Sequence, residues 1–584
     1  MPEFRIGEQD FLLDGQPFRV LSGALHYFRV HPGQWADRID KARRMGLNTI
    51  ETYVPWNAHA PTPGEFDLTG GLDLGRFLRL VGEAGMYAIV RPGPYICAEW
   101  DNGGLPAWLF RDPETGIRRT EHRYLAAVRE YLRRVHEVVA PLQVHRGGPV
   151  ILVQIENEYG AYGSDKVYLK TLVDYTSDAG ITVPLTTVDQ PIDEMMVAGR
   201  IDGVHMTASF GSRAAERLAT LRRHQPTGPL MCSEFWVGWF DHWGAHHHTT
   251  PVEEAAAELD TLLAAGASVN IYLVHGGTNF GLTSGASDKG VYQPTVTSYD
   301  YDAPLDEAGR PTAKYHAFRE VIAKYHPVPD APPPVPPAPS LATPLGDPVH
   351  LFDNPDAWGT WQRHHALPRL DDLDGAPRLA LLRTRIDVPG AAVLGFGEVR
   401  DRASVFLDDR PVGTLLREHH QRVLGLGSGT GSLSVLVEDQ GRVNYGPRIG
   451  EPKGLIGGAT LNGIPLTGWE VLPIDLSCPP PVWAGEQRTP VTGAVAGPVL
   501  LRAGFSLPEP ADLHLDTRGW GKGVVWVNGF CLGRYWSRTP QRTLYLPGPV
   551  VRAGENEVVV LELDAMAEPV VRFVPEPLPG HTEA

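Results

Sequence analysis

Glutamates that directly follow apolar runs have the type and spacing for acid–base chemistry in this sequence. Glu156 and Glu158 follow the apolar run at 150–155, and Glu234 ends the run at 229–234. A carboxyl group in such a position is costly inside a core unless it has partners. The ordinary explanations are a solvated loop or a buried salt bridge. The functional explanation is a catalytic pair of carboxyl groups. Two opposed carboxyl groups, one protonated and one ionised, can cleave a glycosidic bond, and this chemistry needs no metal and no cofactor.

Aromatic and carboxylate side chains follow two further apolar runs. Residues 51–57 read ETYVPWN, and residues 91–100 read RPGPYICAEW. Aromatic faces can stack on the apolar C–H face of a pyranose ring, while carboxylates and amides hydrogen-bond its hydroxyl groups. A carbohydrate site would follow if these segments and the glutamates met at one place in the fold.

The elements that must position these residues are short apolar runs separated by amphipathic segments. Helical patterns include 72–86 and 124–142, and a further helix opens with a capping box at Thr250–Glu253, with proline at the first helical position. A doubly wound open sheet would alternate in the same way, but no GxGxxG motif follows the first run. Eight alternating strands therefore predict a parallel (β/α)₈ TIM barrel. The eight runs lie at 19–25, 48–54, 87–92, 150–155, 183–188, 202–207, 229–234 and 268–274.

In such a barrel the C-terminal ends of all strands open at one mouth, where chemistry gathers. The four segments named above lie at predicted strand ends, so we expect them to meet there. Glu158 and Glu234, on the fourth and seventh strands, would then face each other across the mouth.

The composition changes after the barrel pattern. The proline-rich segment 326–342 forbids helix and favours a stiff spacer between two globular regions, although a proline-rich recognition motif is the alternative. Short β-rich runs separated by Gly, Pro and Asn then predict two β-sandwich or jelly-roll domains. The predicted organisation is a catalytic barrel at 1–325, the linker, a first β domain at 343–482 and a second at 483–584.

Charge and cysteine content limit the partners and the compartment. The 584 residues include 69 acidic and 52 basic ones, so the formal net charge is −17. Nucleic acid and anionic membranes need basic surfaces, so we expect neither as a partner. The first residues lack the apolar stretch of a signal peptide, and no window reaches the ~18 apolar residues of a membrane helix. Four cysteines without metal-ligand spacing fit a reducing compartment. We expect a cytoplasmic protein, and the sequence leaves open whether it forms a homo-oligomer.

The run GGPVILVQIENEY at 147–159 resembles the signature of glycoside hydrolase family 35, the β-galactosidases that include the lysosomal enzyme. The likeness covers nearly the whole chain, including ETYVPWN and RPGPYICAEW. Further matching segments are SEFWVGWFDHWG (233–244), GASVNIYLVHGGTNFG (266–281), TSYDYDAPLDEAG (297–309), GRVNYG (441–446) and GWGKGVVWVNGFCLGRYW (519–536).

The resemblance implies a retaining exo-β-galactosidase that acts on a β-galactoside oligosaccharide or glycoconjugate. It makes Glu158 the acid/base and Glu234 the nucleophile, with carboxyl groups about 5–5.5 Å apart. It implies a second β domain of the galactose-binding type, although packing against the barrel would also explain these β domains. The substrate-binding positions implied by the family are Tyr53, Ala98, Glu99, Asn157, Tyr272 and Tyr301.

These roles require opposite environments for the two carboxyl groups. Glu158 must hold its proton near neutral pH, so we expect burial or a nearby negative charge to raise its pKa above about 4.3. Glu234 must stay ionised, so we expect donors such as a tyrosine hydroxyl around it.

Other interpretations stay open at this point. The same carboxylates could serve an exo-glycosidase for β-glucosaminides or β-arabinosides, or the chain could be a sugar-binding protein that has lost catalysis. We expect no metal at His246–His248, because adjacent histidines cannot easily face one ion. Cys97 and Cys232 are interpreted as packing residues rather than nucleophiles. Trp236 and Trp239 could belong to the core or line the entrance.

Overall fold

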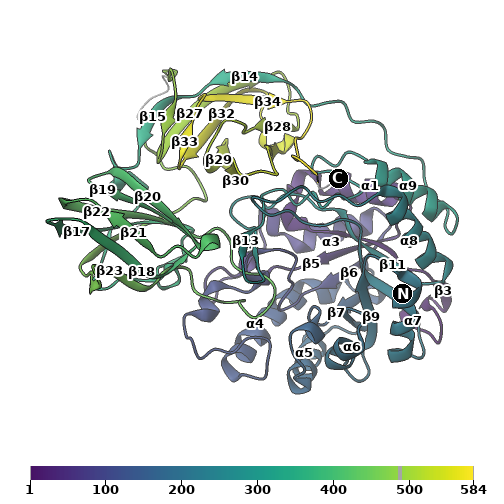
Figure 1. The fold of residues 1–584 in the computed structure, drawn as a ribbon. Coiled ribbons are helices and arrows are strands. Elements are labelled where there is room, and N and C mark those ends of the chain that lie inside the picture. The colour runs from purple at the N-terminus through teal and green to yellow at the C-terminus, as the bar shows by residue number, and fades with distance from the viewer. Residues whose placement is uncertain (1, 484–488, 583–584) are drawn as a thin grey trace.

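The computed structural model describes residues 2–483 and 489–582. Its N-terminal part is a closed barrel of eight parallel strands in the order β10-β11-β4-β5-β6-β7-β8-β9 (Figure 1). Every strand overlaps one of the eight predicted runs, so the predicted TIM barrel is confirmed. The barrel strands are β4 (Leu21–Leu25), β5 (Thr49–Tyr53), β6 (Tyr87–Arg91), β7 (Val150–Gln154), β8 (Leu185–Asp189), β9 (His205–Phe210), β10 (Met231–Trp236) and β11 (Ser268–His275).

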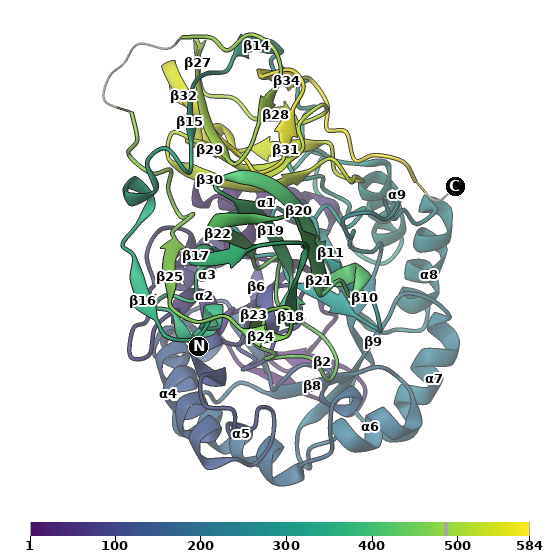
Figure 2. The ribbon, with the colours of Figure 1, turned by 60° about the vertical axis from the view of Figure 1, so that its left-hand side comes forward.

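Helices surround the barrel as an outer layer (Figures 1 and 2). In α4, which covers most of the predicted helix at 124–142, Val128, Leu132 and Val135 are buried at helical spacing. The capping box predicted at Thr250 was wrong. Pro251 takes the N-cap position without a side-chain bond, and the Thr250 N–H donates to Asp302 Oδ2 at 2.7 Å instead. The main helices are α1 (Trp35–Met45), α3 (Leu74–Glu83), α4 (His122–Val139), α5 (Lys166–Asp178), α6 (Asp193–Gly199), α7 (Ala214–His224), α8 (Val252–Ala264) and α9 (Ala313–Ala323).

The rest of the chain forms antiparallel sheets, as predicted. In the first β domain (strands β16–β25), a six-stranded sheet, β16-β25-β17-β22-β19-β20, and a four-stranded sheet, β21-β18-β23-β24, share one apolar core. In the C-terminal β domain (strands β14, β15 and β26–β34), the sheets β15-β27-β32-β29-β30 and β14-β34-β28-β31 share another. A third apolar cluster joins the two domains through side chains of β17 (Leu379–Val388) and β29 (Lys522–Val527). In both ribbon views the C-terminal β domain adjoins the first β domain and the barrel (Figures 1 and 2).

The strand pairing differs from the predicted domain limits at one place. β14 (Leu341–Pro344) and β15 (Gly346–His350) pair with β34 (Val570–Val574) and β27 (Val499–Leu507), so residues 341–350 belong to the C-terminal sheets. The prediction had placed 343–350 in the first β domain, because pairing with strands so far along the chain leaves no local signal. The predicted boundary at 482–483 adjoins residues 484–488, which lie outside the described residues.

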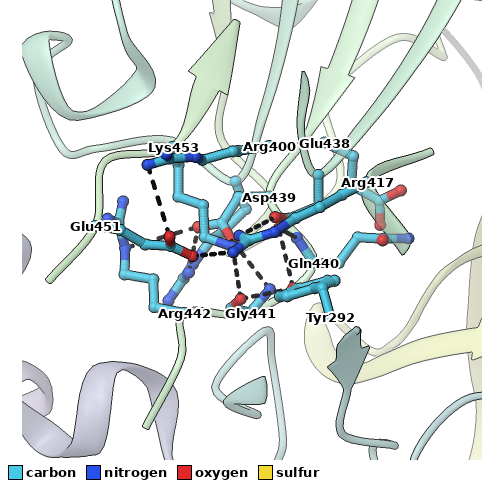
Figure 3. A network of polar contacts seen from close by, with 12 residues as sticks. Tyr292, Arg400, Arg417, Glu438, Asp439, Gln440, Gly441, Arg442, Glu451 and Lys453 are labelled. Carbon is cyan, nitrogen blue, oxygen red and sulfur yellow. Dashed lines mark hydrogen bonds and ion pairs between the residues drawn. The ribbon is translucent and has the colours of Figure 1, made fainter. Parts of the chain in front are cut away.

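Opposite charges are buried where the first β domain meets the barrel (Figure 3). Lys453, fully buried, lies with its Nζ 2.5 Å from Asp401 Oδ2, 2.7 Å from the Gly441 carbonyl oxygen and 3.3 Å from Asp439 Oδ1. The hydroxyl of Tyr292 is 2.7 Å from the same carbonyl oxygen and lies on β13 (Tyr292–Pro294), which pairs with β12 in a two-stranded sheet beside the barrel. Lys453, Asp401, Asp439 and Tyr292, together with Arg378, Arg417, Arg442 and Glu451, are called the interface ion cluster.

We expect Lys453→Met to lower the free energy of unfolding by about 3 kcal/mol, because it leaves buried carboxylates without one of their cations. Urea unfolding followed by tryptophan fluorescence measures this change. The control is Lys170→Met, because Lys170 pairs with Asp174 on an exposed helix surface, where loss of a pair costs about 0.5 kcal/mol. Equal effects of the two substitutions would show that the interface ion cluster does not stabilise the fold.

No helix in the described parts of the chain is both long and apolar enough to cross a membrane.

Candidate active site

A cavity of about 300 Å³ opens at the C-terminal mouth of the barrel. Its wall is built from the ends of several barrel strands and the loops that follow them, as expected for this fold. A larger, open hollow of about 1220 Å³ lies at the opposite end of the barrel, where Leu230 and Gly266 precede two strands, and it holds none of the predicted site residues. All eight predicted site residues line the smaller cavity: Tyr53, Ala98, Glu99, Asn157, Glu158, Glu234, Tyr272 and Tyr301.

Hydrogen-bond donors surround the carboxylate of Glu234, as predicted. The Tyr53 hydroxyl donates to Glu234 Oε1 at 2.8 Å, and Arg91 Nη2 donates to the same oxygen at 2.5 Å. Trp236 Nε1 donates to Oε2 at 3.2 Å. The pairing of β10 with β9 shifts register between Cys232 and Glu234, and such a bulge re-aims a side chain. These donors stabilise negative charge at Glu234.

Glu158 has a different environment. Its pKa is raised to about 7, chiefly because burial penalises the charged form, and also because Glu234 is negatively charged. Hydrogen bonds from Ser209, whose Oγ lies 2.7 Å from Glu158 Oε1, and from Gln190 oppose this shift in part. The expected rise of the Glu158 pKa is therefore present, and both expected causes contribute to it.

Glu156, the other glutamate of the run, does not reach the cavity. Arg118 binds both of its carboxylate oxygens, at 3.0 and 2.8 Å, and the Tyr168 hydroxyl donates to Oε1 at 2.8 Å. The salt-bridge interpretation therefore holds for Glu156, and Glu158 alone of the two faces the cavity. Glu156 and Glu158 both have left-handed backbone conformations, with φ of +58° and +44°. Such conformations cost about 1–3 kcal/mol each and persist where the surroundings enforce them.

Arg91 connects several of these groups and was not singled out from the sequence. Besides Glu234, its guanidinium bonds Asn157 Oδ1 and Glu51 Oε1, the latter at 3.1 Å, and it lies over the Tyr53 ring. Burial raises the pKa of Glu51 to about 7, and Arg91 opposes this rise. The position of Arg91 at the end of a strand that leads to the site was the one signal that could have identified it.

Glu99 lies in the wall that faces the tyrosines. The Tyr299 hydroxyl donates to Glu99 Oε2 at 2.5 Å and is 3.0 Å from the Tyr272 hydroxyl. Burial raises the pKa of Glu99, while the Tyr299 hydrogen bond and the charge of Arg29 oppose the rise. Arg29, which follows β4, also donates from Nη2 to the Ala98 carbonyl oxygen at 2.5 Å, so it helps to hold the loop that carries Ala98 and Glu99.

The cavity is also lined by residues that were not predicted as site residues from the sequence. Trp236 and Trp239 belong to its wall, and Trp239 is 41% exposed. Of the two alternatives left open by the sequence, both tryptophans therefore line the entrance. Asn444 and Tyr445 come from the first β domain, and their one signal in the sequence is the segment GRVNYG. The remaining unpredicted lining residues are Ile96, Cys97, Gln190, Phe240, Ser287 and Lys289.

The thiols and histidines considered from the sequence do not form an alternative centre. Burial raises the pKa of Cys97 and Cys232, which keeps both thiols protonated and weakly nucleophilic, although Cys97 does line the cavity. His247 Nδ1 lies 2.7 Å from Asp241 Oδ2, so this histidine has a carboxylate partner. Within residues 2–483 and 489–582, no group of three His, Cys, Asp or Glu side chains is arranged to hold a metal ion.

Known proteins resemble this chain over nearly its whole length. The family model for glycosyl hydrolases family 35 matches residues 10–325, and models for a β-galactosidase first all-beta domain and galactose-binding domain match 379–475 and 498–556. A β-galactosidase of Xanthomonas manihotis is 39% identical over 93% of this chain and 91% of its own. The β-galactosidase of Mus musculus is 39% identical over 95% of this chain and 90% of its own. The β-galactosidase of Homo sapiens is 38% identical over 97% of this chain and 87% of its own. The chain therefore belongs to glycosyl hydrolase family 35.

Proposed function

We propose that the protein is an exo-β-galactosidase that removes terminal, non-reducing β-D-galactose. The observation that carries this proposal is the placement of Glu158 and Glu234 in one small cavity, with the raised pKa on the first and hydrogen-bond donors around the second. Relatives at about 39% identity that are named β-galactosidase support the choice of sugar. The small volume of the cavity also favours removal of one terminal residue over internal cleavage of a chain.

The proposed reaction is a double displacement. Glu234 attacks the anomeric carbon while protonated Glu158 donates its proton to the glycosidic oxygen, so the leaving alcohol departs neutral and a galactosyl ester forms on Glu234. Glu158, now ionised, takes a proton from water as the water attacks the anomeric carbon, and the ester bond to Glu234 breaks. Tyr53, Ala98, Glu99, Asn157, Tyr272 and Tyr301, the other predicted residues on the cavity, are proposed to bind the sugar.

The pH profile follows from the need for a protonated Glu158. Because its pKa is about 7, the protonated fraction falls as the pH rises above this value. We expect kcat/KM for a β-galactosyl disaccharide, whose leaving alcohol needs a proton, to fall about tenfold per pH unit on the alkaline side. Initial rates between about pH 5 and pH 9, at substrate concentrations well below KM, measure the profile. A profile that stays flat to about pH 9 would contradict the role of Glu158 as acid.

A panel of nitrophenyl glycosides tests the choice of sugar. We expect release of nitrophenol from the β-D-galactoside and little from the α-galactoside, the β-glucosaminide or the arabinoside. A clear preference for one of the others would replace galactose with that sugar and leave the two carboxyl roles standing. No turnover of any member, with galactose binding retained, would favour the sugar-binding protein that lacks catalysis.

A further inference from the structure

A loop of the first β domain takes part in the wall of the cavity. This loop, residues 440–446, follows β22 (Gly429–Glu438) and is called here the insertion loop. Its backbone bonds the barrel directly: the Arg442 N–H donates to Asp101 Oδ1 at 2.8 Å, and the Asn444 N–H donates to the Ala286 carbonyl oxygen at 3.1 Å. Asn444, which is 1% exposed, is thereby brought to the cavity from outside the barrel.

The amide of Asn444 contacts the carboxylate of Glu99. Its Nδ2 lies 3.4 Å from Glu99 Oε1 and 3.5 Å from Cys97 Sγ. The backbone carbonyl of Asn444 accepts a hydrogen bond of 2.5 Å from the Tyr95 hydroxyl, which fixes the base of the side chain. Tyr299 holds the other oxygen of Glu99, so the carboxylate is held from the barrel on one side and from the β domain on the other.

The barrel leaves space for this asparagine. A Cβ atom at Gly285 would lie 2.8 Å from Asn444 Oδ1, too close for the amide to stay where it is. A Cβ atom at Gly103, where φ is +61°, would lie 2.2 Å from the Tyr95 ring and 3.1 Å from the Asn444 carbonyl oxygen. The glycines at these two positions therefore allow the insertion loop to pass close to the barrel backbone.

The interface ion cluster holds the insertion loop at its start. The Gly441 carbonyl oxygen accepts from Lys453 Nζ at 2.7 Å, and Arg442 Nη1 lies 2.6 Å from Asp371 Oδ1. Figure 3 shows Gly441 and Arg442 among the charged side chains of this cluster. Because these ions are buried, displacement of the loop would expose or separate charges, which is costly.

We propose that Asn444 is a positioning residue that holds the Glu99 carboxylate for a sugar hydroxyl, so that the barrel and the first β domain together form the galactose site. This inference rests on the proposed function and extends it, because the reacting carboxyl groups and the proposed sugar-binding residues all come from the barrel. The amide donates a hydrogen bond to the charged form of Glu99, and a hydrogen bond to a buried charge contributes strongly.

Asn444→Ala tests the proposal through sugar binding. We expect KM for a nitrophenyl β-galactoside and the inhibition constant of free galactose to rise together by about tenfold, with kcat changed by less than about threefold. This division is expected because Glu158 and Glu234 stay in place. The control is Asn462→Ala in the same domain, since Asn462 bonds the Val393 N–H in a turn and does not line the cavity.

Asn444→Asp supplies a readout that loss of structure would not give. An ionised carboxylate beside Glu99 repels it, so at about pH 8 we expect KM to exceed that of Asn444→Ala. At about pH 5 the introduced carboxyl group is protonated by its proximity to Glu99, donates a hydrogen bond as the amide did, and should bring KM below that of Asn444→Ala. The ionisable groups around Glu99 that enter this comparison are Arg29, Cys97, Glu234, Tyr272, Tyr299 and Tyr301.

The proposal is supported if KM of Asn444→Asp is above that of Asn444→Ala at about pH 8 and below it at about pH 5. It is overturned if the same variant has the higher KM at both pH values. A folded Asn444→Ala enzyme with the KM of the parent also overturns it. Should Asn444→Ala fail to fold, the isosteric Asn444→Asp is compared with the parent enzyme, and equal KM values at about pH 8 overturn the proposal. Failure of the proposed function is a separate result, because the parent enzyme itself would then not hydrolyse β-galactosides.

Discussion

Replacing Glu234 with glutamine is expected to lower kcat for β-galactosides by about 10⁴-fold or more, because the amide cannot form the galactosyl ester. The substitution also removes the negative charge that would face the positive anomeric carbon in the transition state. The amide oxygen can still accept from the Tyr53 hydroxyl and Arg91, which donate to Glu234 Oε1 in the parent. We therefore expect the unfolding temperature to change little and galactose to bind still.

Azide distinguishes a lost nucleophile from a general loss of activity. In Glu234→Gly, the small anion can enter the space of the missing carboxylate and attack the anomeric carbon from the same face, so the expected product is α-galactosyl azide. NMR of the product assigns its anomeric configuration. The control is Glu254→Gln, an exposed glutamate on α8, which should leave kcat unchanged. Near-normal turnover by Glu234→Gln would contradict the assignment of the nucleophile.

The sequence predicts the barrel well because its signal is local. Each barrel strand is a short apolar run followed by a helix, and the fold brings all strand ends to one mouth. Tyr53, Glu158 and Glu234 could therefore be assigned to one site before their contacts were known. The resemblance to family 35 then separated them into roles, which the apolar pattern alone could not do.

Contacts between distant segments could not be predicted in the same way. Asn444 meets Glu99 across 345 positions of sequence, and nothing in the β-rich pattern shows that the insertion loop docks on the barrel. The same holds for β14, whose pairing with β34 depends on the assembled sheets.

The choice between Glu156 and Glu158 was also hidden from the spacing of residues. The two glutamates are two positions apart, and either would have satisfied a strand-end pattern. The structure separates them because Arg118 binds Glu156, whereas Ser209 binds Glu158 at the cavity. Both residues adopt left-handed backbone conformations, which no local propensity favours. The strand-end pattern thus locates the segment, and the resemblance to family 35 assigns the acid/base role to Glu158 within it. In the structure, the neighbours of each carboxylate determine that Glu158 lines the cavity and Glu156 does not.

Replacing Glu158 with glutamine is expected to slow cleavage by an amount that depends on the leaving group. A sugar alcohol needs a proton to depart, so kcat/KM for a disaccharide should fall about 10³-fold. A dinitrophenolate leaves without help, so for an activated aryl galactoside we expect kcat/KM to fall by about tenfold or less. For the disaccharide, the alkaline limb near pH 7 should disappear, because the proposed proton donor, whose pKa is raised, is gone. Hydrolysis of a series of aryl galactosides measures the leaving-group dependence.

Two comparisons make the result specific to Glu158. Azide added to Glu158→Ala should trap the galactosyl ester on Glu234 from the opposite face and give β-galactosyl azide, the other anomer from that expected with Glu234→Gly. Glu156→Gln should lower the unfolding temperature, because it breaks the buried pair with Arg118, yet leave the leaving-group dependence as in the parent. Since burial and the charge of Glu234 raise the pKa of Glu158, an unchanged pH profile in Glu158→Gln would mean that another group supplies the proton.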